Sequence, residues 1–245
     1  MFCSFLSMGE QKIKCGKYIT ALPVMLCCFI INSYAQTAED IINQVKTKIA
    51  AVNDYEVNGN MKTNVAFIKA PLAKVKVYFK KPNRLLLKNE SGISFIPKGS
   101  VNINLGNIFA TSGKYDIIDV GKENATGLRI IKLLPQDEDA DVVLSTLYID
   151  EKQLLVKKAK TTTKENGTYE LEMTYGKYAE YGLADKVKFS FNTKDYKLPK
   201  GVTFDYDDGT KKQPDPGKIK NRKGTVEITY SGYIINKGVP DKVFQ

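Results

Sequence analysis

Two groups of carboxylate side chains are the residues of this sequence best suited to chemistry. One group is Asp137, Glu138, Asp139 and Asp141, and the other is Asp205, Asp207 and Asp208. Hard cations bind carboxylate oxygens, but neither group has the glycine and the terminal glutamate of a Ca²⁺-binding loop at the required spacing. A pair of carboxylates could also hydrolyse a glycosidic bond, although the spacing favours no particular pair. We interpret both groups as solvated carboxylates in turns.

Histidine is absent from the 245 residues, and the four cysteines all lie among the first 28. The absence of histidine excludes histidine-based triads, imidazole general bases and histidine metal sites. The sequence also contains neither the phosphate-binding G-x-x-x-x-G-K-S/T motif nor a dinucleotide-binding fingerprint between a strand and a helix. We therefore expect a protein that is not an enzyme and that uses no metal and no cofactor.

The first 35 residues have the pattern of a secretory signal peptide. Three lysines precede an apolar run at residues 19–31, and Ser33-Tyr34-Ala35 places small residues at the −3 and −1 positions of a cleavage site. The run is shorter than the roughly 20 residues of a membrane span. A permanent anchor or lipidation at Cys27 are the alternatives. We predict cleavage near Ala35, which delivers a domain of residues 36–245 to the periplasm without any cysteine, and therefore without disulfides.

The chain is basic, with a net charge of +10. Cleavage would remove three lysines and one glutamate, which leaves +8. Such a charge suits anionic membrane surfaces or lipopolysaccharide. Several lysines cluster in a polar loop at residues 207–223, but no aromatic residues alternate with them as they do in nucleic-acid sites. We expect a solvated basic surface and no nucleic-acid partner.

The exported part begins with one amphipathic helix. Thr37 is a good N-cap, Asp40 follows three residues later, and the pattern ends near Asn53-Asp54. The apolar residues at helical spacing are Ile41, Ile42, Val45, Ile49 and Val52.

From Tyr55 onward the apolar period is two, which predicts strands with one apolar face and one wet face. The runs lie near residues 55–67, 74–80, 84–88, 93–96, 115–120, 128–134, 142–149, 154–163, 169–175, 186–191, 202–206 and 225–235. Residues 150–153 and 165–167 are typical of hairpin turns, so we expect an antiparallel meander. Residues 99–113 could be a loop or a short helix. The fold class is α+β and mainly antiparallel β, in one domain.

A sheet of about eleven strands with one apolar face must curve so that this face is buried. A closed barrel of about eight strands can be filled by its own side chains, whereas a larger or partly open barrel leaves room for a ligand or a helix. The period of the strands does not distinguish a filled interior from a hydrophobic cavity, and both remain possible at this stage.

The order of these segments resembles a known family. The helix leads through Asn53-Asp54-Tyr55 into a long strand, and a second strand ends in the sequence YFKKPNR at residues 78–84. Further segments match in the same order: Leu133-Leu134-Pro135, residues 147–151, the strand pair 154–163 and 167–175, residues 188–191 and residues 198–202. Over residues 37–206 the chain is similar to the LolA/LolB-type lipoprotein carriers.

This resemblance implies an unclosed half β-barrel of about eleven strands with the N-terminal helix as its lid. It further implies a monomer that binds lipoprotein acyl chains or other lipids and moves them between an inner-membrane donor complex and an outer-membrane acceptor. The candidate residues to line such a cavity and contact lipid are Ile41, Ile42, Val45, Ile49, Val75, Val77, Phe79, Leu85, Leu87, Ile93 and Phe95. The alternative for each of them is ordinary packing in the core. The carriers commonly hold tryptophans in the cavity, and this chain has none.

The resemblance also assigns a lid latch to Lys81, at a position where the carriers usually have arginine. Lysine keeps the charge but lacks the planar fork of arginine. Two alternatives to a carrier stay open. One is an envelope-stress sensor of the RseB type, although only about 40 residues follow the matched region. The other is a general binding protein for glycolipids or other hydrophobic ligands.

Overall fold

The computed structural model describes residues 36–65, 68–69, 72–82, 84–91, 114–165, 167–192 and 223–245. Thr37–Gln245 form one compact unit, which contains all the elements below. The predicted signal peptide, the possible strands at 93–96 and 202–206, the patch at 99–113 and the loop at 207–222 lie outside the described residues.

The predicted N-terminal helix is confirmed as α1 (Ala38–Ala50). Its capping box is complete: Asp40 N donates to Thr37 Oγ1 at 3.1 Å, and Thr37 N donates to Asp40 Oδ2 at 3.3 Å. One face of α1, with Ile41, Ile42 and Val45, is buried. Within the described part of the chain, no helix is long and apolar enough to cross a membrane.

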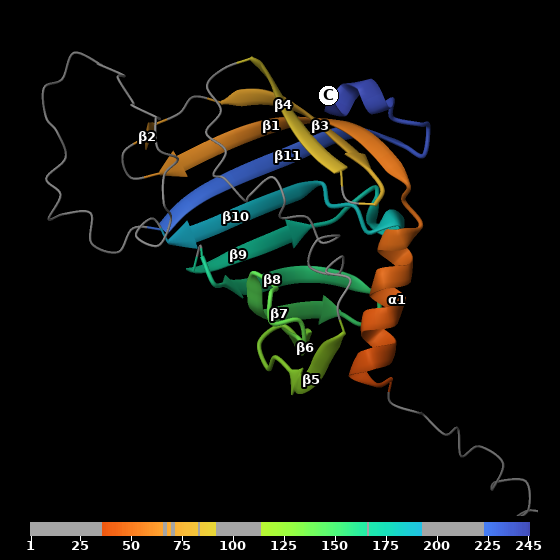
Figure 1. The fold of residues 1–245 in the computed structure, drawn as a ribbon, viewed down its shortest axis with the longest axis vertical. Helices are drawn as coiled ribbons and strands as arrows, with labels where there is room; N and C mark the ends of the chain where they lie inside the picture. The colour runs from red at the N-terminus through yellow and green to blue at the C-terminus, as the bar shows by residue number, and fades with distance from the viewer. Residues whose placement is uncertain are drawn as a thin grey trace, which may run out of the picture. The chain divides into compact units, whose positions relative to one another are not determined.

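Eleven strands of the described residues form one antiparallel sheet (Figure 1). They are β1 (Asp54–Val65), β2 (Ile68–Lys69), β3 (Ala73–Lys80), β4 (Arg84–Ser91), β5 (Tyr115–Lys122), β6 (Arg129–Pro135), β7 (Val142–Asp150), β8 (Leu155–Thr163), β9 (Gly167–Thr174), β10 (Lys186–Asn192) and β11 (Lys223–Ile235). Two short 3₁₀ turns are η1 (Ala179–Tyr181) and η3 (Asp241–Phe244). The strand order is β4-β3-β1-β11-β10-β9-β8-β7-β6-β5, and β2 pairs with β1.

The pairing of β1 with β11 joins the two ends of the domain. Asn64 lies opposite Thr225, and Tyr55 lies opposite Ile235. The last strand, which no segment of the family resemblance covers, is therefore central in the sheet. From β5 to β11 the strands follow the predicted meander, with turns at 151–154 and 164–165.

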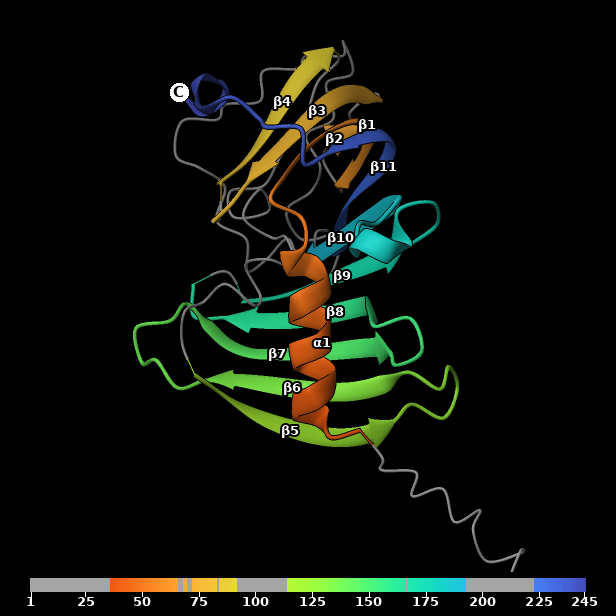
Figure 2. The same ribbon diagram turned by 90° about the vertical axis from the view of Figure 1, so that its right-hand side faces the viewer.

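The sheet is an open barrel with α1 on its concave side (Figures 1 and 2). Among the described strands, β4 and β5 are the two ends of the sheet and do not pair with each other. The predicted unclosed barrel with a helix as its lid is confirmed.

The two faces of the sheet differ as the period of two predicts. On the concave face, residues in register across neighbouring strands are apolar, such as Leu171 and Phe189 on β9 and β10. On the convex face, cations and anions alternate from strand to strand and form ion pairs. These pairs are Lys158–Glu170 at 3.1 Å, Lys188–Glu172 at 2.9 Å and Lys186–Glu227 at 2.9 Å.

Candidate functional site

The concave face and the buried face of α1 together form an apolar interior. Ile41, Ile42 and Val45 of α1 are at most 1% exposed and belong to the same core as the strands. Ile49, one turn further along, is partly buried and packs against this core. The four residues of α1 predicted to contact lipid therefore all face the interior.

The residues predicted on β3 and β4 also lie on the concave face. Val75 and Val77 are buried, whereas Phe79, Leu85 and Leu87 are half-buried. Phe79 pairs with Leu85, and Val77 pairs with Leu87. Ile93 and Phe95, the last two predicted lining residues, lie outside the described residues.

Helix α1 covers only part of the concave face. Its 13 residues make a rod about 20 Å long. The main path of ten strands spans about 43 Å at about 4.8 Å per interval. Figure 2 shows α1 crossing β5 to β8, so the concave side of β11, β1, β3 and β4 is not beneath α1.

Most of the interior comes from strands whose residues the sequence analysis did not assign to the site. The buried members are Met61, Ile131, Leu133, Leu147, Ile149, Val156, Ala159, Leu171, Met173, Phe189, Phe191 and Val226. The signal was present, because the alternation that places Val75 and Val77 on one face places these residues on a face of their own strands. The alternation alone could not show which strand faces share one interior, because that depends on the order of the strands in the sheet.

Five aromatic rings gather in the interior near the end of α1. Tyr55 stacks on Phe79 with ring centroids 5.2 Å apart, and Tyr233 contacts Tyr55, Tyr178 and Tyr230 at 5.4, 4.9 and 5.8 Å. Tyr233 Oη donates to the Ala184 carbonyl at 2.7 Å. Burial raises the pKa of Tyr55 and Tyr233, and it raises the pKa of Tyr230 to about 12. These phenols stay neutral near pH 7 and extend the apolar wall.

Lys81, the predicted latch, contacts the carboxyl end of α1. Its Nζ donates to the Ala50 carbonyl and to Asn53 Oδ1, the latter at 3.0 Å. The last carbonyls of a helix lack partners within the helix and carry partial negative charge, so an ammonium group stabilises them. The structure thus brings Lys81 to the segment that joins α1 to β1.

Asn236 holds the same segment from the other side and was not predicted. Asn236 Oδ1 accepts from Asn53 N at 2.7 Å, and Asn236 Nδ2 donates to the Ala51 carbonyl at 3.1 Å. The residue has φ +55°, in the left-handed region that asparagine tolerates. Because 183 positions separate it from Asn53, no local pattern could have linked the two.

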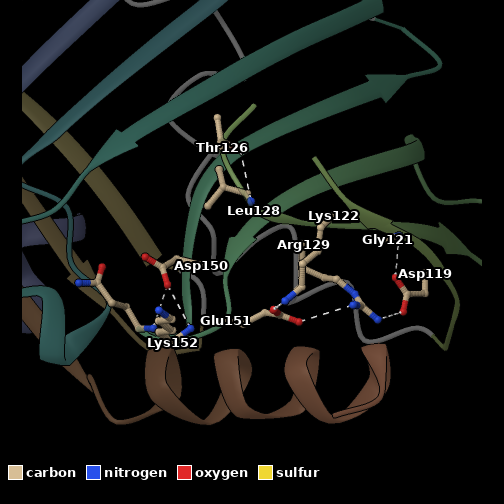
Figure 3. Close-up of polar contacts among 10 residues, drawn as sticks. Asp119, Gly121, Lys122, Thr126, Leu128, Arg129, Asp150, Glu151 and Lys152 are labelled. Carbon is tan, nitrogen blue, oxygen red and sulfur yellow. Dashed lines mark hydrogen bonds and ion pairs between the residues drawn. The ribbon is translucent and has the colours of Figure 1, made fainter. Parts of the chain in front are cut away.

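A polar cluster lies where the β5–β6 and β7–β8 turns meet (Figure 3). Arg129 Nη2 donates to Asp119 Oδ2, and Arg129 Nη1 lies 3.7 Å from Glu151 Oε1. Lys122 Nζ lies 2.5 Å from Glu151 Oε2. Partial burial disfavours the charged form of Asp119, but hydrogen bonds from Arg129 and from Gly121 N outweigh it and lower the pKa of this carboxyl.

The acidic loop after β6 forms the hydrogen bonds of a turn, which agrees with the interpretation of its residues as turn carboxylates. Asp139 N donates to Asp137 Oδ1 at 3.0 Å, and Lys164 N donates to the Asp141 carbonyl at 2.8 Å. Among the residues that the structure describes, no three acidic, cysteine or histidine side chains are placed to hold a metal ion. Asp205, Asp207 and Asp208 lie outside that part of the chain.

No protein-family model matches the chain, and no curated protein matches its sequence. Solved structures do match its fold. A domain assigned to outer membrane lipoprotein sorting from Vibrio parahaemolyticus has a TM-score of 0.55 at 10% identity, covering 85% of this chain and 97% of that one. A LolA superfamily protein from Nitrosomonas europaea has a TM-score of 0.54 at 12% identity, covering 86% and 98%. This chain has the LolA fold.

A third structure extends the same likeness. A DUF1329 family protein from Desulfovibrio piger has a TM-score of 0.50 at 14% identity, covering 85% of this chain and 95% of that one. At such low identities the likeness establishes the LolA fold and leaves the ligand to be argued from the residues of this chain.

Proposed function

We propose that this protein binds the acyl chains of a lipid or lipoprotein between α1 and the concave face of its open barrel. The observation that carries the proposal is the apolar interior, to which α1, β1, β3 and all strands from β6 to β11 contribute buried side chains. Among the described residues, α1 is the one α-helix, and it lies over this face. The apolar side chains of α1 cover the concave face with hydrocarbon. An acyl chain that displaced α1 would cover the same face with the same kind of surface.

The energies involved fit a carrier that must release what it binds. A 16-carbon chain left in water costs on the order of 10 kcal/mol at about 0.8 kcal/mol per CH₂. Ile41, Ile42 and Val45 together gain roughly 6 kcal/mol from burial, at about 2 kcal/mol each. Exchanging these side chains for an acyl chain therefore leaves a modest net affinity, and a bilayer can take the chain back.

The sequence and the family resemblance support a cellular role for this binding. We place the protein in the periplasm as a monomer that moves acyl chains from an inner-membrane donor to an outer-membrane acceptor without catalysing a reaction. The signal-peptide pattern of residues 1–35 supports the compartment, and the absence of histidine supports a role without catalysis.

Purification from a bacterial envelope tests the proposal directly. Native mass spectrometry should find the protein with a bound lipid, and organic extraction should identify that lipid. The protein should also take up a purified lipoprotein from membranes. Recovery without any lipid, together with failure to accept a lipoprotein, would exclude the carrier function.

A further inference from the structure

Arg129 is a charged residue on the apolar side of the sheet. It begins β6 and lies opposite Ile149 of β7, which is fully buried. Two residues further along the same face, Ile131 is also fully buried. A guanidinium costs free energy in such surroundings unless its charge and its donors are satisfied, so its partners decide what it can do.

Two carboxylates from different turns hold the guanidinium. Asp119 accepts from Nη2, and Glu151 lies 3.7 Å from Nη1 and is itself bound by Lys122. Figure 3 shows Arg129 between these two acids. The four side chains carry two positive and two negative charges, so the cluster has no net charge.

One donor of Arg129 is left over. The Nε atom is buried and has no hydrogen-bond partner among the residues that the structure describes. Buried donors in folded proteins are nearly always paired, because leaving one unpaired costs the full desolvation penalty. A fixed, buried N–H on an apolar wall is a site for one acceptor atom.

We propose that Arg129 Nε donates to the carbonyl oxygen of the ester or amide that links a bound acyl chain to its head group. The inference rests on the proposed function and adds the position and chemistry of the head. A neutral carbonyl fits better than a fatty-acid carboxylate, because the charges of Arg129 and Lys122 are already balanced by Asp119 and Glu151 and leave no surplus positive charge for a third carboxylate. The interior therefore prefers esterified lipids to free fatty acids, with their heads at the β5–β6 and β7–β8 turns.

The test compares two ligands that share one acyl chain. Methyl palmitate and palmitate are titrated against the full protein by displacement of a fluorescent apolar probe. The wild type should bind the ester at least about tenfold more tightly, as expected for a hydrogen bond to a charged group. Arg129→Lys keeps the charge but removes Nε, and should reduce this preference to less than about threefold. Arg84→Lys is the matched control on the convex face and should keep the full preference.

A second variant keeps Arg129 and tests whether the charge of the cluster disfavours a carboxylate ligand. Glu151→Gln takes away one of the two negative charges, so the affinity for palmitate should rise while that for methyl palmitate stays within about twofold. Equal binding of ester and acid by the wild type, or an unchanged preference in both Arg129→Lys and Glu151→Gln, would overturn the inference and leave lipid binding intact. Binding of neither ligand would instead contradict the proposed function.

Discussion

Lys81 and Asn236 are two single residues that bind the segment at the carboxyl end of α1. Both bind carbonyl oxygens at the carboxyl end of α1, Lys81 at Ala50 and Asn236 at Ala51. A carbonyl accepts from a single ammonium N–H, so the planar fork of arginine is not needed for these contacts. At this scale the sequence resemblance located Lys81 and missed Asn236, whose partners are distant in the chain.

Replacing Lys81 with leucine should loosen the end of α1. The variant loses hydrogen bonds to Ala50 and Asn53, and because these contacts are exposed we expect a loss of about 1 kcal/mol in unfolding free energy. Urea unfolding measures the loss, and hydrogen exchange should show faster exchange in the last turn of α1. The control is Lys152→Leu at an exposed turn position, which should change neither the unfolding free energy nor the hydrogen exchange of α1. If Lys81→Leu also changes neither quantity, Lys81 is not a latch.

Asn236 allows its backbone and side-chain roles to be separated. Asn236→Ala loses the side-chain hydrogen bonds and places alanine, which tolerates the left-handed region less well than asparagine, at φ +55°. We expect a loss of about 2 to 3 kcal/mol in urea unfolding. Asn236→Gly loses the same bonds but tolerates the backbone, so it should be about 1 kcal/mol more stable than the alanine variant. Equal stabilities for the two would show that the left-handed backbone carries no cost.

At the scale of elements, the proposed function makes α1 a competitor of the ligand. Its buried side chains occupy the interior that an acyl chain would enter, whereas residues of the strands would contact that chain. Local periodicity predicted α1 and every strand except the two-residue β2, since amphipathic patterns need only neighbouring residues. It could not predict that β11 would pair with β1, because that choice depends on the whole sheet.

This competition predicts opposite effects for two truncations. Ile42→Ala in α1 should lower the unfolding free energy by about 2 kcal/mol, yet raise lipid affinity by up to about thirtyfold, because the same energy no longer holds the lid closed. Val77→Ala on β3 should lower both stability and affinity. Lipid titration and urea unfolding on both variants check this, and a lower affinity in Ile42→Ala would contradict the competition.

Residues 36–245 contain neither histidine nor cysteine, so we expect an unusual pH profile for this part of the molecule. None of its side chains ordinarily titrates near neutrality, and its stability should be constant between about pH 6 and pH 9. Tyr230 has a folded pKa of about 12, above the value of about 10 in the unfolded chain. Its contribution is present below about pH 10 and is lost as the pH rises toward about 12.

The check is urea unfolding at a series of pH values for the wild type and Tyr230→Phe. The wild-type stability should fall above about pH 10, and the variant should fall less steeply. Superimposable curves would show that Tyr230 is not protected from ionisation in the folded protein.

The sequence predicted more of the fold than of the candidate site. The alternation of residues such as Val75 and Val77 specified an apolar face, and the ordered motifs indicated an open barrel. Arg129 occupies a position in phase with Ile131 and Leu133, which is a signal that the sequence contained. The role of Arg129 could not be predicted, because it depends on Asp119 and Glu151. These residues come close to Arg129 only when two separate turns meet in the folded sheet.

Neighbouring leucines of β4 provide the most direct test of the central claim. Leu87 pairs with Val77 on the concave face, and Leu86 pairs with Tyr78 on the convex face. A benzophenone amino acid placed at either position and irradiated in living cells would crosslink to whatever lies beside it. Binding of acyl chains in the interior predicts a lipid adduct at position 87 and none at position 86. Equal adducts at both positions, or none at position 87, would contradict it.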